Sequence, residues 1–125
     1  MKLAEWYDHE VHGPYGPEEA LVDAIQTGSF RAILASMRLF NHITNWPKLY
    51  RLANERGIWQ KVGAVYGVAK LFMKVKRQPK LYEHKHARYK QWQQLSQLRK
   101  KNYPEIAEKW HVYIPFNPKD LEEVR

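Results

Sequence analysis

The stretch IWQKVGAVYGVAKLFMKVKR, residues 58–77, is the most hydrophobic segment of the chain and decides the fold. Apolar side chains recur at helical spacing along one side, and further apolar residues widen that stripe until little polar surface remains. The stripe and its flanks comprise Ile58, Val62, Val65, Tyr66, Ala69 and Phe72, then Trp59, Val68, Leu71 and Val75. Because such a helix is normally enclosed by its neighbours, the sequence predicts a central helix over about residues 58–77.

Two glycines, Gly63 and Gly67, lie four residues apart on this predicted helix. Each costs about 1 kcal/mol against alanine in a helix interior, so both need a structural reason. Small residues at this spacing let a neighbouring segment approach closely, and tight helix packing is the interpretation that we favour. The same face continues as Lys70, Lys74 and Arg77, so the alternative is a phosphate backbone lying along one stripe that turns from small to basic.

Three shorter helices are expected before the central one. Pro17 suits the first position of a helix, where a missing N–H costs nothing. Ser29 is a candidate N-cap for a second helix over residues 29–42. Asn45 is a candidate N-cap for a third helix, which Gly57 ends.

Two helices are expected after the central one. Pro79 interrupts the pattern, and a long polar helix is predicted from about Lys80 to Asn102. A short helix, PEIAEKW, then follows at residues 104–110. The closing sequence HVYIPFNP alternates as a strand would, but its two prolines limit it to an edge strand or an extended tail.

These elements predict an all-α fold. We expect one compact domain over residues 1–125 with five or six helices, an irregular arm at 1–16 and an extended tail at 112–125. The tail carries several large apolar side chains, so it either packs back on the core or docks on another chain. We favour packing back.

The absence of cysteine excludes a disulfide framework, a thiolate metal site and a cysteine nucleophile. It fits the reducing cytoplasm, where we expect the protein to lie. The start, MKLAEWYDHE, has no apolar core of a secretory signal, and no apolar run approaches the roughly 20 residues that a membrane span needs. No membrane contact is therefore expected.

Charge is strongly segregated along the chain. Residues 1–63 carry seven basic and seven acidic side chains, residues 64–125 carry fourteen and six, and residues 70–101 carry eleven and one. A local field of this kind attracts anions, and nucleic acid is the commonest polyanion. The predicted binding site comprises Lys70, Lys74, Lys76, Arg77, Lys80, Lys85, Arg88, Lys90, Trp92, Arg99, Lys100 and Lys101.

In this prediction the cations contact phosphates, and Trp92 can stack on unpaired bases. The alternative for Trp92 is that it packs into the core together with Tyr89 and Leu95 as one face of the long helix. Most of the cations are lysines, which discriminate little among bases. The expected partner is DNA or RNA bound with low sequence specificity.

Histidines raise the alternative of a metal-independent ribonuclease, in which His84 or His86 takes the 2′-OH proton and nearby cations hold the phosphate. Because residues i and i+2 of a helix point to different sides, we expect no catalysis. The sequence DHEVH at 8–12 has one residue too few for the zinc motif His-Glu-x-x-His. No metal and no cofactor are expected.

One resemblance covers roughly residues 16–75. The segments GPEEALVDAI and NWPKLYRLANERGIWQKVGAVYGVAKLF resemble the C-terminal domain of AbiEi-family type IV antitoxins. The matching residues are Pro17, Glu18, Ala20, Leu21, Asp23 and Ala24, then Leu52, Ala53, Gly57, Val62 and Gly63. The resemblance implies a non-catalytic regulator that opposes a nucleotidyltransferase toxin. The family places a winged helix-turn-helix before this domain, and we expect none within residues 1–125.

Two alternative functions would also explain the positive charge of residues 70–101. Small, basic, helical subunits line the nucleic-acid path of ribonucleoprotein and RNA-guided complexes, and this chain has their size and charge. The basic segment can instead bind an acidic protein partner.

Overall fold

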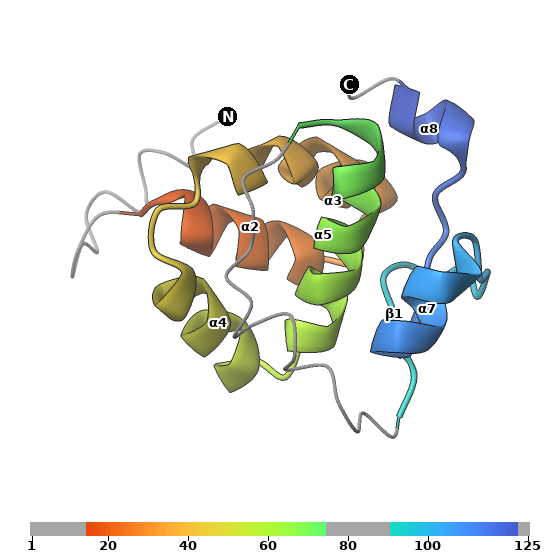
Figure 1. The fold of residues 1–125 in the computed structure, drawn as a ribbon. Coiled ribbons are helices and arrows are strands. Elements are labelled where there is room, and N and C mark those ends of the chain that lie inside the picture. The colour runs from red at the N-terminus through yellow and green to blue at the C-terminus, as the bar shows by residue number, and fades with distance from the viewer. Residues whose placement is uncertain (1–14, 75–90, 123–125) are drawn as a thin grey trace.

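The computed structural model describes residues 15–74 and 91–122. A central helix, α5 (Trp59–Phe72), is surrounded by the other helices (Figure 1). Residues from Val62 to Tyr66 are buried without interruption, and Val68 and Ala69 are 0% exposed. The prediction of a buried central helix is thus confirmed, because α5 has apolar contacts on nearly every side.

The predicted C-terminal extension of this helix to residue 77 is wrong. The helix ends at Phe72, and Met73 has extended backbone with φ −148° and ψ 160°. The side-chain amide of Asn41 donates to the Lys74 carbonyl oxygen at 2.7 Å, so a tertiary hydrogen bond satisfies that carbonyl instead of a further helical turn. Lys74 therefore does not continue the helical stripe of Gly67 and Lys70.

The helices before α5 follow the predicted capping residues. They are α2 (Pro17–Gln26), α3 (Phe30–Ser36), the 3₁₀ helix η1 (Met37–His42) and α4 (Trp46–Glu55). Ser29 accepts a hydrogen bond from the Ala32 N–H at 3.3 Å, and Asn45 accepts one from the Lys48 N–H at 3.0 Å. The second predicted helix, 29–42, is thus one α-helical segment that tightens into a 3₁₀ helix after Ser36.

Glu18 connects α2 to the start of α4. It is 4% exposed, and its Oε2 accepts hydrogen bonds from the backbone N–H groups of Thr44 at 3.1 Å and Asn45 at 3.2 Å. A buried carboxylate needs such donors, since an unsatisfied one would cost several kcal/mol or more. This contact fixes the loop from which η1 passes into α4.

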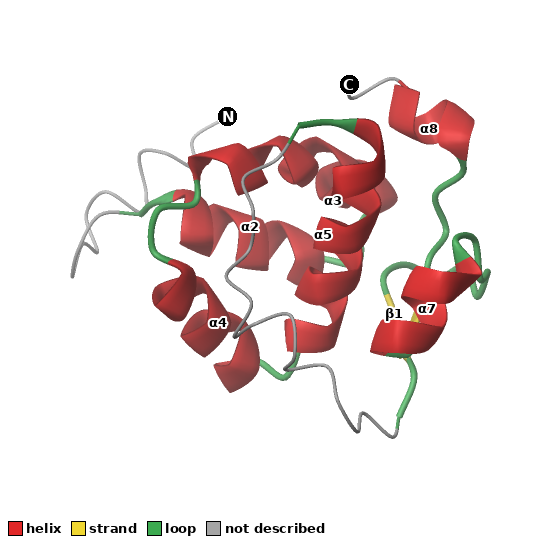
Figure 2. Cartoon of the chain, in the orientation of Figure 1, coloured by secondary structure: helices red, strands yellow, loops and turns green. Residues whose placement is uncertain are grey.

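The C-terminal part forms a layer against α5. It contains β1 (Gln93–Gln94), α7 (Pro104–Trp110), β2 (Val112–Tyr113) and α8 (Pro118–Glu122). The two strands pair in parallel, with Gln93 opposite Val112, and they form the one small sheet of the described residues (Figure 2). The α7 helix confirms the short helix predicted at 104–110.

The long helix predicted from about 80 to 102 is wrong over residues 91–102, and residues 75–90 lie outside the described part. Here the backbone N–H of Gln93 donates to the His111 carbonyl at 2.9 Å, and that of Asn102 donates to the Ile114 carbonyl at 3.3 Å. Leu95 between them is 0% exposed. Pairing with the following segment and burial of Leu95 outweigh the weak helix propensity of a polar sequence.

The predicted tail packs back on the core, as we favoured. Val112, Ile114, Phe116 and Leu121 are each 0% exposed. The tail is not extended throughout, because Asn117 and Asp120 cap each other's backbone N–H groups and start α8.

The predicted fold class is confirmed. The described residues contain six α-helices and a two-stranded sheet. None of the helices in residues 15–74 and 91–122 has the length and apolar character needed to cross a bilayer.

Both central glycines face α7, and tight packing explains them. A Cβ built on Gly63 would lie 2.4 Å from ring carbons of Trp110, and one on Gly67 would lie 3.2 Å from Cγ2 of Ile106. The close approach predicted from the spacing is therefore made by α7 side chains. No phosphate can lie along this stripe, because Trp110 and Ile106 already occupy it.

Candidate nucleic-acid interface

The predicted binding residues divide into two groups. Lys76, Arg77, Lys80, Lys85, Arg88 and Lys90 lie outside the described residues. The described ones come from three places: Lys70 and Lys74 at the end of α5, Trp92 just before β1, and Arg99 to Lys101 in the loop between β1 and α7. The prediction placed Lys70 and Lys74 on the central helix and Arg99 to Lys101 at the end of a second helix, but in the structure Lys74 lies beyond α5 and Arg99 to Lys101 lie outside any helix.

Lys70 and Lys74 are exposed at the C-terminal end of α5. The Lys70 ammonium lies 5.5 Å from the centroid of the Tyr66 ring, which holds its aliphatic stem against the helix. A cation in the last turn is favoured by the negative end of the helix dipole. Lys70 therefore presents its charge to solvent from the last turn of α5, and Lys74 does so from the segment just beyond the helix.

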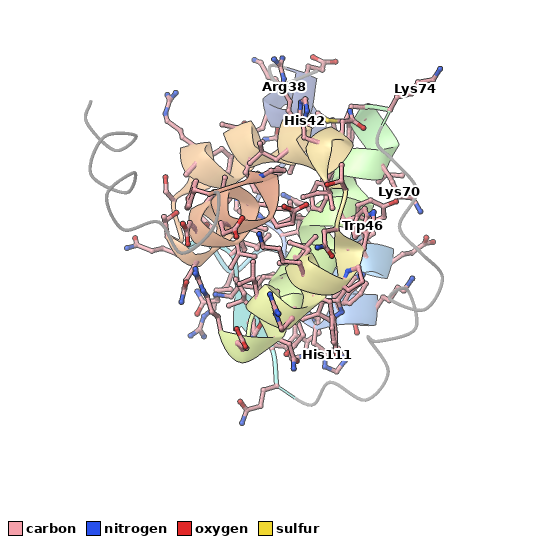
Figure 3. All side chains as sticks on the ribbon, turned by 90° about the vertical axis from the view of Figure 1, so that its left-hand side faces the viewer. Arg38, His42, Trp46, Lys70, Lys74 and His111 are labelled. Carbon is pink, nitrogen blue, oxygen red and sulfur yellow. The ribbon has the colours of Figure 1, made fainter. Side chains whose placement is uncertain are left out.

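The 3₁₀ helix η1 adds two residues that the sequence analysis missed, Arg38 and His42. Both are exposed, and the bond from Asn41 to the Lys74 carbonyl joins η1 to the end of α5. Figure 3 shows Arg38 and His42 at the same end of the molecule as Lys74, with Lys70 next along the edge. We call Arg38, His42, Lys70 and Lys74 the α5-end surface.

A signal for these two residues is present in the sequence. Charge counts over residues 1–63 and 64–125 do not reveal the positive charge around Arg38, because six of the seven acids of the first half precede residue 24. Residues 24–82 contain eleven lysines and arginines but a single acid, Glu55. A charge count in a sliding window would have placed Arg38 inside the basic region.

Three acids of the described part form ion pairs with cations other than Lys70 and Lys74. Glu19 pairs with Lys48 at 2.6 Å, Asp23 with Arg56 at 2.6 Å, and Glu108 with Lys101 at 3.3 Å. Within residues 15–74 and 91–122, no carboxylate lies within ion-pair distance of Lys70 or Lys74. Within the described residues, Lys70 and Lys74 are therefore not neutralised by an ion pair.

The pKa of Glu19 shows that its carboxylate favours the ion pair with Lys48. Burial by itself would raise the pKa of Glu19, but the Lys48 ammonium and the Gly16 N–H at 2.9 Å outweigh burial and lower the pKa. A carboxylate with a lowered pKa stays ionised and paired at neutral pH. It is not available to compensate the lysines at the end of α5.

Arg99, Lys100 and Lys101 do not close a helix, contrary to the prediction. Lys101 lies in an isolated parallel bridge with Ile114, and its ammonium is 3.3 Å from Glu108 and 4.4 Å from the centroid of Trp92. Arg99 and Lys100 are exposed. Lys101 is thus committed to internal contacts, whereas Arg99 and Lys100 can reach an anion.

Trp92 packs against other side chains. The His111 imidazole stacks on it with centroids 4.9 Å apart and planes 3° apart, and the Tyr113 ring lies 5.0 Å away. His111 reaches this position because it ends α7 in the left-handed conformation, with φ 52°. Together with Lys101, these groups leave little ring surface for a base, which favours the packing alternative for Trp92.

We expect Trp92→Ala to reduce stability rather than single-strand binding alone. Trp92 is only half-buried, so losing its ring contacts should cost about 1–2 kcal/mol, less than a fully buried Trp. Thermal unfolding followed by circular dichroism measures this loss. Stability equal to the wild type, combined with weaker binding of single strands only, would show that the ring stacks on bases.

The remaining predicted features lie outside the described residues. His84, His86 and the sequence at 8–12 belong to them. Within the described ranges 15–74 and 91–122, no group of three or more His, Cys, Asp or Glu side chains could hold a metal ion.

Comparisons of the chain with family models, curated proteins and solved structures find no match.

Proposed function

We propose that this protein is a small, basic, non-catalytic nucleic-acid-binding protein that contacts phosphates through its 70–101 segment and the adjoining α5-end surface. One observation carries the proposal. Lys70 and Lys74 are exposed, and neither lysine has an ion-pair partner among the described residues. They belong to a longer stretch, residues 24–104, with seventeen basic residues and two acids.

Uncompensated surface cations favour a polyanion for a physical reason. Each phosphate that they neutralise releases condensed counterions, and this release supplies most of sequence-independent affinity. Lysine is a compact charge with little base selectivity, and the α5-end surface contains one arginine fork. Binding should therefore depend weakly on sequence and strongly on salt.

The test is the salt dependence of binding to labelled DNA and RNA of about 20 residues. If roughly four to six phosphates are neutralised, log K against log salt should have a slope of about −3 to −5. The double variant Lys70→Glu/Lys74→Glu should weaken binding to all sequences alike and flatten the slope by about two. Fluorescence anisotropy at several salt concentrations measures both.

A matched control separates local contact from net charge. Lys74→Glu and Arg51→Glu each replace one exposed cation by a carboxylate, and Arg51 lies on α4, at the opposite end from the C-terminus of α5 (Figure 1). Lys74→Glu should reduce affinity about tenfold at 50 mM salt, whereas Arg51→Glu should change it much less. Wild-type protein that binds no DNA or RNA at about 50 mM salt would contradict the proposal and leave an acidic protein as the partner of the basic residues.

More specific roles rest on the sequence alone. The role of an antitoxin-like regulator is proposed from the resemblance of residues 16–75 to the antitoxin family. The role of a subunit in a ribonucleoprotein or RNA-guided complex is proposed from the size and charge of the chain. A nucleotidyltransferase gene beside this one favours the first, and nuclease or guide-RNA genes favour the second. All these roles, with the absence of catalysis, fit the cytoplasmic location that we propose from the lack of cysteine.

A further inference from the structure

A surface pocket of about 320 Å³ lies beside the last turn of α5, where α7 packs against that helix (Figure 1). The close approach of Ile106 to Gly67 sets the distance between the two helices here. The volume is at the lower end of the range for small-molecule pockets, so it suits a single planar ring system. The residues lining the pocket are Leu71 from α5 and Tyr103, Pro104, Glu105 and Ile106 from the start of α7 and the residue before it.

The lining of this pocket exposes apolar surface to solvent. Leu71 is 58% exposed, the largest fraction for a large apolar side chain in the described residues. Tyr103 and Ile106 are half-buried. Covering such a surface with a flat ligand removes apolar area from water, which is favourable in proportion to the area covered.

Tyr103 contributes an aromatic ring whose position is fixed. Its ring packs edge-on against Phe72, with centroids 5.7 Å apart and planes at 74°. Its backbone is left-handed, with φ 55° and ψ 63°, a conformation that a residue other than glycine keeps only where its surroundings hold it. The pocket therefore presents a fixed ring, and every nucleobase has a face that can stack on such a ring.

The charges around the pocket separate a place for a base from places for phosphates. Lys70 directly precedes Leu71, and neither Lys70 nor Lys74 has an ion-pair partner among the described residues. Glu105 lines the pocket itself and is exposed. Its carboxylate repels a phosphate from the pocket, but it can accept hydrogen bonds from N–H groups at the edge of a base. A neutral base in the pocket and phosphates at the lysines match these charges.

We propose that this pocket binds one unpaired nucleobase, while Lys70 and Lys74 contact the adjoining phosphates. This inference rests on the proposed function and adds a base contact to its phosphate contacts. A base inside a duplex cannot enter the pocket without leaving its stack, so the expected ligand is a single strand or a loop. The selectivity is for an unpaired base rather than for one particular sequence, because stacking tolerates all bases.

The experiment compares two single DNA strands of about 12 nucleotides, one with all its bases and one in which abasic sites replace them. Both strands carry the same phosphates, so the salt-dependent part of their affinity is equal. The full chain should bind the strand with bases about tenfold more tightly, because that strand alone can stack in the pocket. Fluorescence anisotropy at about 50 mM salt measures both affinities, and we call their ratio the base advantage.

Variants of the pocket show where the base advantage arises. Leu71→Ala and Tyr103→Leu should each reduce it by about threefold or more and leave the affinity for the abasic strand unchanged. Tyr103→Phe should keep it, because the ring remains and the Tyr103 hydroxyl has no hydrogen-bond partner within the described residues. Leu98→Ala is the matched control, since Leu98 is 48% exposed and lines a different pocket. It should change neither affinity.

The outcomes separate this inference from the proposed function. Equal affinity for the two strands overturns the base pocket, leaves phosphate binding intact and points to an apolar side chain of a protein partner as the occupant. A base advantage that survives unchanged in both folded variants, Leu71→Ala and Tyr103→Leu, also overturns the inference, because another surface then holds the base. Failure of both strands to bind at about 50 mM salt overturns the proposed function itself, and the inference with it.

Discussion

Removal of residues 112–125 is expected to abolish the native unfolding transition or to lower its midpoint by about 20 °C or more. The deletion removes four side chains that are each 0% exposed: Val112, Ile114, Phe116 and Leu121. Full burial contributes about 1.5–3 kcal/mol for each, and their sum is comparable to the entire stability of a domain. Circular dichroism at 222 nm during heating measures the result.

Two point variants refine this test. Phe116→Ala should cost about 3–5 kcal/mol, because Phe116 is fully enclosed and its ring lies 5.0 Å from Phe30. Lys119→Ala, on the exposed side of α8, should change stability by no more than about 0.5 kcal/mol. An unchanged midpoint after the deletion would mean that this segment stabilises a partner rather than its own chain.

Gly63→Ala should destabilise the protein by about 2 kcal/mol, although alanine is the better helix former. The new methyl group would lie 2.4 Å from the Trp110 ring, far inside ordinary contact distance. Trp110 is 3% exposed and packs edge-on against Trp59 at 6.3 Å, so the ring cannot move without displacing a second core side chain. Overpacking should therefore exceed the gain of about 1 kcal/mol in helix propensity.

Gly67→Ala is the matched control on the same helix. Its methyl group would meet Cγ2 of Ile106 at 3.2 Å, and Ile106 is only partly buried, so it can shift by a few tenths of an ångström. We expect unchanged stability or a gain of up to about 1 kcal/mol. Equal effects of the two substitutions would mean that α7 does not hold the position described here.

The helices from Pro17 to Phe72 could be predicted from the sequence because their signals are local. Asn45 caps α4 by a bond to an N–H three residues away, and Gly57, with φ 69°, ends that helix. The apolar residues of α5 occur all round the helix, which requires burial whatever the neighbours are. The spacing of Gly63 and Gly67 likewise predicted a close contact, but it did not identify Trp110 as the contacting residue.

The α5-end surface was predictable only in part. Lys70 and Lys74 follow from the basic run, but Arg38 and His42 lie 28 to 36 positions earlier in the chain. A hydrogen bond from Asn41 to the Lys74 carbonyl links them, and no pattern in either segment encodes it.

The sequence by itself determined the helical class, the central helix, the caps and the excess of positive charge, since each depends on residue type and short spacing. Only the tertiary structure decided where α5 ends and that residues 91–102 are not helical. It also decided that Trp92 lies under His111 and Lys101. In each of these cases a local preference worth a few tenths of a kcal/mol per residue is opposed by contacts from distant segments. Burial of Leu95 and pairing of β1 with β2 contribute more than that preference, and neither can be read from the segment alone.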